Sequence, residues 1–301
     1  MKILVLGGGR SYEREVSLRS AANVTEALRA GGYEVMDADP GAVDFDMAAL
    51  AADCDAIFPI LHGAGGEDGT LQLQLESLNK PFLGSGAKAC ALTFDKERYR
   101  TFMAEHDVRV PRGEVVDVRG FRTSELRRNP YVLKPVDGGS SVDTLILHDL
   151  AREPDDTYFD RLFSRHPQML LEQLIVGQEL TVGVLGDEAL PIILIVPPTG
   201  EEFDYENKYN GRTQEIVDPE QVPEAVKKRA QELALQLHRL TGCRHLSRSD
   251  FIVTPEGELY VLETNTIPGM TAQSLFPKMA AKAGVDMVAL AKRFVTMALE
   301  V

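Results

Sequence analysis

The sequence predicts an α/β unit built on a parallel sheet, followed by a longer region of α+β character. Strands and helices alternate over the first third of the chain, and later strands follow one another through hairpin-like connections. Helical crossovers make neighbouring strands parallel, whereas hairpins make them antiparallel. The length of 301 residues corresponds to about two domains.

The N-terminal unit begins with a strand at Lys2–Leu6, which breaks at consecutive glycines. Apolar residues at helical spacing predict a helix over Glu15–Ala30, which ends at a glycine pair. The elements expected to complete the sheet are the strands Tyr33–Met36, Ala56–Leu61 and Pro81–Leu83 and the helix Thr70–Leu78. We place the end of this unit near residue 86.

After residue 86 the spacing of apolar residues predicts a long helix over Ala87–His106 and further helices at Asp156–Arg165 and Pro223–Leu240. A polar and aromatic loop is expected over Pro197–Pro219. The strands expected here are Tyr131–Pro135, Thr144–His148, Met169–Ile175, Glu179–Leu185 and Leu190–Val196, followed by a hairpin over Arg248–Asn265. A second boundary within residues 171–179 divides the chain into residues 1–86, 87–171 and 172–301.

The composition argues against several classes of protein. Lysine and arginine total 32 and aspartate and glutamate 46, and the net charge of −14 disfavours nucleic acid as the main partner. No apolar run approaches the roughly 18 residues of a membrane-spanning helix, and the N-terminal apolar stretch is too short for a signal peptide. The three cysteines form no CxxC motif, so we expect core thiols and a cytoplasmic protein.

The C-terminal hairpin carries the most informative polar residues. Pairing about a two-residue loop at Glu256-Gly257 places Asp250 opposite Glu263 and Arg248 opposite Asn265, with all four side chains on one face. Opposed side chains lie about 5 Å apart at Cβ, so two carboxylates there repel each other unless a cation lies between them. The alternative is a solvated face without a ligand.

The donor atoms on this face indicate which cation fits. Asp250, Glu263 and Asn265 offer only oxygen, which favours Mg²⁺ or Mn²⁺ over zinc. The strand then runs into a Pro-Gly segment around Gly269, whose backbone amides are suited to stabilising an oxyanion. Arg248 would act beside them as a fixed cation.

Two glycine-rich loops are candidates for ligand binding. Gly138-Gly139-Ser140-Ser141 follows Lys134 at the end of a strand, and such a loop can close over phosphates. His62–Gly69 contains several glycines at the carboxyl end of a strand, where open parallel sheets bind ligands. The sequence has no GxxxxGK[ST] motif, and Gly7-Gly8-Gly9 is not a GxGxxG fingerprint, so a P-loop enzyme and a dinucleotide-binding oxidoreductase are disfavoured.

Taken in chain order, these motifs resemble those of D-alanine–D-alanine ligases, a family of the ATP-grasp superfamily. The resemblance spans the whole chain. The segments that carry it are Ser11–Ser17, His62–Gly69, Lys134-Pro135, Gly139–Val142, Asp204–Tyr209, Arg248–Asp250, Glu263–Thr266 and Pro268–Thr271.

The resemblance implies an ATP-grasp fold with an N-terminal doubly wound parallel-sheet domain. The first D-alanine site would belong to residues 1–86, the central ATP-grasp subdomain to 87–171, and the metal and second-substrate site to 172–301. It also implies ATP-dependent ligation of two D-alanines through an acyl phosphate, for peptidoglycan precursor synthesis. ATP would be a substrate, two Mg²⁺ (or Mn²⁺) ions the cofactors, and a homodimer the assembly.

The resemblance assigns roles by position. Residues that bind the two D-alanines would be Glu13, His62, Ser274 and Leu275. Residues that bind ATP would be Lys96, Lys134, Ser140, Glu172, Leu174, Glu179 and Lys208. Catalysis would rest on Glu13, Ser140, Tyr209, Arg248 and Gly269, and the metal ligands would be Asp250, Glu263 and Asn265.

Two positions depart from the family pattern, and other functions remain as alternatives. The family usually has glycine where this chain has Asp143 and Leu73. A carboxylate beside ATP phosphates would repel them unless it points away. The alternatives are an ATP-grasp ligase with another second substrate, such as a hydroxy acid, and a nucleotide-binding regulator without turnover.

Overall fold

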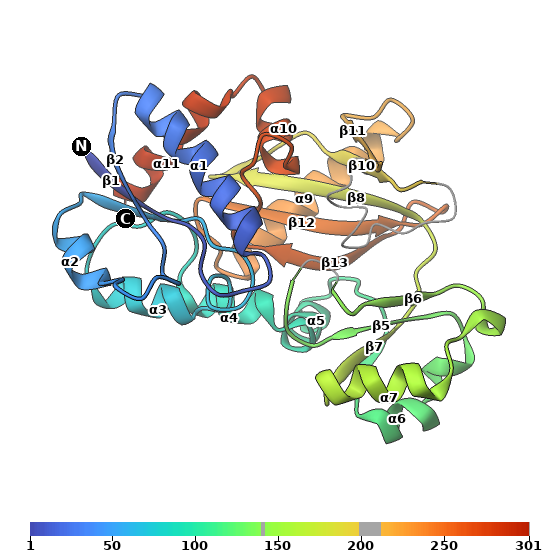
Figure 1. Ribbon diagram of the computed structural model, residues 1–301. Coiled ribbons are helices and arrows are strands. Elements are labelled where there is room, and N and C mark those ends of the chain that lie inside the picture. The colour runs from blue at the N-terminus through green and yellow to red at the C-terminus, as the bar shows by residue number, and fades with distance from the viewer. Residues whose placement is uncertain (140–141, 199–211, 301) are drawn as a thin grey trace.

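The computed structural model describes residues 1–139, 142–198 and 212–300 (Figure 1). Its strands form three sheets, with orders β2-β1-β3, β4-β7-β5-β6 and β11-β10-β8-β12-β13, and β9 adds to β8 in the third. The N-terminal and C-terminal sheets lie close together, while the central sheet projects to one side (Figure 1). Within the described residues, no helix has the length and apolar character needed to cross a membrane.

The N-terminal sheet is parallel, as predicted. It comprises β1 (Lys2–Leu6), β2 (Glu34–Ala38) and β3 (Ala56–Pro59), accompanied by α1 (Arg14–Ala30), α2 (Met47–Ala52) and α3 (Thr70–Ser77). The expected strand Pro81–Leu83 is reduced to a single parallel bridge, between Phe82 and Ile57 of β3. The short helix α2 was not anticipated.

The N-terminal sheet shares its hydrophobic core with the end of the chain. Helix α1 buries Val24 and Leu28 in a cluster that also contains Phe276 and Phe294. The last two come from α10 (Leu275–Lys282) and α11 (Met287–Leu299), which lie beside α1 (Figure 1). The first and last segments of the chain therefore pack as one layer.

The central sheet is antiparallel and covered on one face by helices. Its strands are β4 (Gly113–Val116), β5 (Tyr131–Pro135), β6 (Leu145–Leu147) and β7 (Met169–Gln173), with α6 (Val118–Thr123), α7 (Asp156–Arg165) and the short 3₁₀ turns η1 (Leu126–Arg128) and η2 (Leu150–Arg152). Along β5, Tyr131 and Leu133 are buried beneath the helices, so by the strand's two-residue period Lys134 faces the opposite side.

The single long helix predicted over 87–106 is instead two helices, α4 (Ala87–Phe94) and α5 (Lys96–Glu105). The break falls at Asp95, which is extended and accepts a hydrogen bond from the Arg98 amide as the N-cap of α5. The Lys96 amide bonds to the Val136 carbonyl, which holds the start of α5 against the end of β5.

The third sheet forms the opposite wall. It comprises β8 (Gln178–Leu185), β9 (Glu188–Ala189), β10 (Ile193–Val196), β11 (Gln214–Val217), β12 (Leu246–Val253) and β13 (Leu259–Asn265), with α9 (Glu224–Leu240) against it. Strand β11 lies within the range expected to be a loop; it forms because its residues pair with β10.

The hairpin of β12 and β13 confirms the predicted pairs Arg248–Asn265 and Asp250–Glu263, although the predicted loop was wrong. Thr254 donates to Glu258 across a three-residue loop in which Gly257 has φ +82°, a left-handed conformation suited to glycine. On β13, Leu262 is an extra residue between Val261 and Glu263, the partners of Phe251 and Asp250, and this bulge shifts the register back by one residue. As a result, the consecutive residues Leu262 and Glu263 both line the same cavity.

Candidate active site

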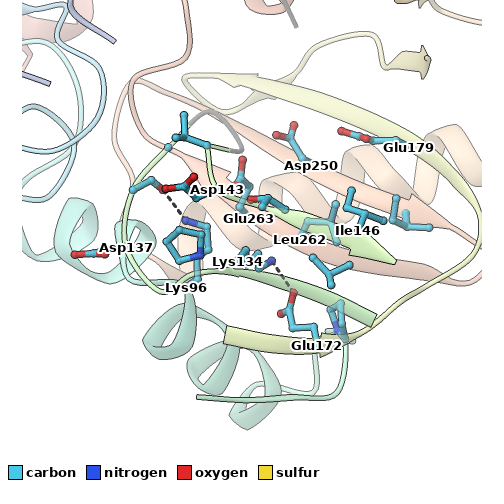
Figure 2. Close-up of a pocket in the computed structure, with 18 of the residues that line it drawn as sticks. Lys96, Lys134, Asp137, Asp143, Ile146, Glu172, Glu179, Asp250, Leu262 and Glu263 are labelled. Atoms are coloured by element: carbon cyan, nitrogen blue, oxygen red, sulfur yellow. Dashed lines mark hydrogen bonds and ion pairs between the residues drawn. The ribbon is translucent and has the colours of Figure 1, made fainter. Parts of the chain in front are cut away.

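A cavity of about 1270 Å³ lies between the central and third sheets (Figure 2). The central sheet contributes Lys134, Ile146 and Glu172 to its wall, and the facing strands contribute Glu179 and Asp250. Figure 2 shows these side chains directed into one space from the two sheets. Its volume exceeds that of a small-metabolite pocket and suits a nucleotide.

Two lysines provide positive charge in this cavity. Lys134 Nζ lies 2.6 Å from a Glu172 carboxylate oxygen, and their side chains are 13% and 5% exposed, so the ion pair is nearly buried (Figure 2). Lys96 Nζ donates to the Gly138 carbonyl at 2.5 Å. Burial lowers the pKa of Lys96, and nearby Lys134 adds to that effect, while Glu263 opposes it. Both ammonium groups are thus placed where an anionic ligand could bind.

A second cavity of about 810 Å³ adjoins the first. The residues common to the walls of both include Glu13, Lys96, Gly139 and Glu263. The second cavity is also lined by His62, Arg248, Asn265, Gly269, Ser274 and Leu275. The two spaces therefore meet at a charged junction, which could bring the end of a nucleotide to a small polar substrate.

Arg248 and Asp250 form a forked ion pair at this junction. Arg248 Nε and Nη2 donate to the two Asp250 oxygens at 3.0 and 2.8 Å, and Thr181 donates to Asp250 at 2.5 Å. Burial alone would lower the pKa of Arg248, but the negative charges of Asp250 and, to a smaller extent, Glu263 outweigh the effect of burial and raise it. The guanidinium therefore remains a permanent cation beside the cavity.

The junction residues also fit a magnesium ion. Asp250, Glu263 and Asn265 come from paired strands and present only oxygen atoms, the ligands that Mg²⁺ prefers. Over the described parts of the chain, no group of three or more His, Cys, Asp and Glu residues gathers as a metal centre, so the candidate set is two carboxylates and an amide. Asn265 Oδ1 also accepts from the Ile267 amide at 2.9 Å, which fixes the side chain.

Glu13 reaches the junction through gaps left by two glycines. A Cβ at Gly63 would approach Glu13 Oε2 to 2.7 Å, and a Cβ at Gly139 would approach it to 2.5 Å. Real Cβ contacts are not that short, so a side chain at either position would force the Glu13 carboxylate to move, and the two glycines leave room for it where it lies. The two loops identified from the sequence are thus brought together around one side chain.

Glu67 is a buried carboxyl group that sequence reasoning did not single out. Its Oε2 accepts from the Gly63 amide at 2.5 Å, and it lines the second cavity. Burial and the nearby Glu13 carboxylate raise the pKa of Glu67 well above its usual range. The available signal was its position inside the glycine-rich loop after β3, where an acidic residue has no core role.

Asp143, which follows the glycine-rich segment after β5, is paired with basic side chains. Its backbone has φ +57°, a conformation that glycine adopts without strain, and its carboxylate lies 3.0 Å from Arg165 Nη2 and 2.7 Å from His166 Nε2. Arg165, the last residue of α7, offsets its charge. The other departure, Leu73, is 64% exposed on α3 and lines neither cavity.

The remaining expected site residues divide into two groups. Leu174 and Glu179 line the first cavity, and Ser274 is the N-cap residue of α10, with its hydroxyl 2.8 Å from Thr271 Oγ1. Ser140, Lys208 and Tyr209 lie outside the described residues.

Comparison with known families decides the relationship. A family model described as the D-ala D-ala ligase C-terminus matches residues 117–296, and one described as the D-ala D-ala ligase N-terminus matches residues 37–85. The chain belongs to the D-alanine–D-alanine ligase family.

Relatives in the D-alanine–D-alanine ligase family match over nearly the full length. The D-alanine–D-alanine ligase of Methylobacterium radiotolerans is 42% identical, with 94% of each chain covered, and that of Sphingopyxis alaskensis is 40% identical over 99% of this chain and 97% of the relative. The ATP complex of the Bacillus anthracis ligase has a TM-score of 0.85 at 29% identity, covering 100% of this chain and 98% of that one.

A further structural neighbour is the VanG D-Ala:D-Ser ligase of Enterococcus faecalis, with a TM-score of 0.82, 26% identity and 99% of both chains covered. Together these neighbours confirm the expected ATP-grasp fold with its N-terminal parallel-sheet domain. The proposed division at residues 86 and 171 stays a prediction.

Proposed function

We propose that the protein uses ATP to join two D-alanine molecules into D-alanyl-D-alanine for peptidoglycan synthesis. The observation that carries this proposal is the meeting of a nucleotide-sized cavity and a smaller polar cavity at Glu13, Lys96 and Glu263. A ligase that activates a carboxylate with ATP needs such a junction, because the γ-phosphate must reach the acceptor carboxylate. Membership in the ligase family supports the same reaction.

The reaction has two steps. The carboxylate of the first D-alanine attacks the γ-phosphorus of ATP, the bond to the bridging oxygen breaks, and ADP leaves with an acyl phosphate in place. The amine of the second D-alanine, in its neutral form, then attacks the acyl carbon. The tetrahedral intermediate expels inorganic phosphate, and the new amide loses its extra proton.

The nucleotide would occupy the first cavity. Lys96 and Lys134 would bind its phosphates, and Leu174 and Glu179 would contact its adenine and ribose. Glu172 would act mainly by holding Lys134 in place, given their 2.6 Å contact. The family resemblance adds Lys208 and Ser140 to the phosphate contacts.

The amino acids would occupy the second cavity. Glu13 would pair with the ammonium group of the first D-alanine. The carboxylate of the second D-alanine would bind at the N-terminus of α10, at Ser274 and Leu275. Arg248 and the Gly269 amide would stabilise the oxyanion of the tetrahedral intermediate. His62 lines this cavity beside them, and the resemblance joins Ser140 and Tyr209 to Glu13 in a network over the substrates.

Asp250, Glu263 and Asn265 would hold two Mg²⁺ ions. When bound, such ions neutralise the negative charge of the ATP phosphates. Arg248 orients Asp250 through its forked contact. The cytoplasm as compartment and a homodimer as assembly are part of the same proposal, and they rest on the family resemblance.

The test is a coupled measurement of phosphate and dipeptide with ATP, Mg²⁺ and D-alanine, alongside D-serine, D-lactate and L-alanine. We expect one D-alanyl-D-alanine per phosphate and no reaction with L-alanine. Absence of dipeptide with every amino acid, despite ATP binding, would overturn the proposal in favour of a nucleotide-binding regulator. Preferential use of D-serine as second substrate would support a function like that named for the VanG neighbour.

A further inference from the structure

The segment that carries Gly269 is held by the N-terminal helix α1, across the interface between the first and last parts of the chain. Ser20 and Asn23 lie three residues apart and so on one face of α1. The Met270 amide donates to Ser20 Oγ at 3.1 Å, and Asn23 Nδ2 donates to the Met270 carbonyl at 2.6 Å. Both polar groups of the Met270 backbone are thus bound by one helix.

Ser20 also links this segment to His62. Its side chain is fully buried, and Ser20 Oγ lies 3.1 Å from His62 Nε2. Ser20 accepts from Met270 and still has its own proton to donate, which His62 Nε2 accepts in the tautomer that is protonated at Nδ1. The other ring nitrogen of His62 then carries the proton, and the ring bonds to the Ile267 backbone.

The neutral state of His62 agrees with this arrangement. Burial, together with the Arg248 charge, lowers the pKa of His62 to about 4. A neutral ring can accept from Ser20 at one nitrogen and donate at the other, which an imidazolium cannot do. His62 thereby holds Ile267, and Ser20 holds Met270, at the two ends of the same short segment.

Gly269 lies between these two anchors and faces the second cavity. A Cβ at Gly269 would come within 2.8 Å of Ser274 Oγ, so this backbone is in close contact with the proposed second-substrate site. The Asn265 bond to the Ile267 amide ties the segment to the candidate metal ligands as well. A shift of Met270 would therefore displace the Gly269 amide from the reacting carbon.

We propose that Ser20, assisted by Asn23, is a positioning residue for the second half of the reaction, which holds the Gly269 amide in place through Met270 and His62. This inference rests on the proposed ligase function. It predicts that loss of Ser20 impairs amide formation while leaving acyl-phosphate formation less affected. The acyl phosphate would then be lost to water, so phosphate release would exceed dipeptide formation.

The experiment compares Ser20→Ala with Ser17→Ala in the full-length protein. Ser17 is also fully buried on α1 and also makes two hydrogen bonds, accepting from Gly8 and donating to Ile60, but it does not contact the Gly269 segment. Each variant therefore loses one serine hydroxyl from a fully buried position on α1. For each we measure dipeptide formed per phosphate released, the KM for ATP and for D-alanine, and the unfolding midpoint.

We expect Ser20→Ala to slow dipeptide formation roughly 5- to 150-fold, the effect of leaving a buried donor unsatisfied, and to lower the ratio of dipeptide to phosphate. Ser17→Ala should keep the ratio of the parent protein even if it is equally destabilised. Asn23→Ala, at a half-buried position, should lower the ratio in the same direction but by less.

Equal ratios in Ser20→Ala, Asn23→Ala and the parent protein would overturn the inference while leaving the ligase function standing. If Ser20→Ala does not fold, Asn23→Ala decides: a ratio equal to that of Ser17→Ala refutes the positioning role. If the parent protein forms no dipeptide, the proposed function fails and this inference fails with it.

Discussion

The buried ion pair of Lys134 and Glu172 allows the structural and the catalytic contribution of one lysine to be separated. Lys134→Met removes the cation but leaves the Glu172 carboxylate in a site where it is only 5% exposed. Breaking a buried pair in this way costs about 3–5 kcal/mol, because the remaining charge has no compensation. For a chain of 301 residues, this corresponds to a fall of roughly 5–8 °C in the unfolding midpoint.

Replacing both partners should have a different effect on stability. Lys134→Met combined with Glu172→Met leaves no buried charge, and apolar residues of similar volume often match or exceed a buried pair in stability. We therefore expect the double variant to recover most of the unfolding midpoint. ATP affinity should be roughly 10- to 150-fold lower than in the parent protein, both in Lys134→Met and in the double variant, because each has lost a charged contact to phosphate.

The assay combines thermal unfolding with equilibrium binding of ATP, for the parent protein, both single variants and the double variant. Glu172→Met measures any contribution of Glu172 itself to binding. Recovery of ATP affinity together with stability in the double variant would refute the reasoning. It would mean that Lys134 serves only to neutralise Glu172.

Three further outcomes are expected. Glu263→Gln keeps the side-chain size but removes one of the opposed carboxylates, so the Mg²⁺ concentration for half-maximal ADP formation should rise ~10-fold or more; an unchanged titration would show that Glu263 is not a ligand. Asp143→Gly loses the ion pair with Arg165, whose side chain is 58% exposed, but relieves a left-handed backbone. These opposing effects should change the free energy of unfolding by less than about 1 kcal/mol in denaturant titrations; a loss above 2 kcal/mol would contradict this. Burial lowers the pKa of His238 to about 4, so between that value and 6.5 only the unfolded chain takes up the proton, and acid destabilises the fold. Between pH 7.5 and 5 this proton uptake should lower the free energy of unfolding by about 2 kcal/mol. His238→Gln should lose this contribution, whereas the control His106→Gln, at an exposed position, should keep it.

The hairpin shows both the strength and the limit of reading a sequence. Alternation of side chains correctly placed Asp250 opposite Glu263, but the loop was assigned one residue too short. The pairing survived because the bulge beside Leu262 restores the register. Bulges depend on how the strand packs against its neighbours, and no local pattern in this sequence marks one.

Other features needed contacts that a single sequence does not reveal. The break at Asp95 could have been recognised, since aspartate is a favoured N-cap residue and signals the start of a helix. The approach of Glu13 to Gly63 and Gly139, by contrast, joins segments far apart in the chain. The bond of Ser20 to Met270 spans 250 positions and follows only from the complete fold.

The core shared by α1 and α11 has a consequence for how the protein is made. The N-terminal sheet is synthesised first, yet α1 packs against α11, whose last residue is Leu299. While the ribosome is still translating, Val24 and Leu28 therefore lack their final partners and remain open to solvent or to a chaperone. The N-terminal unit can complete its packing only after α11 has emerged, so a stop codon that removes α11 would damage the first domain as well as the last.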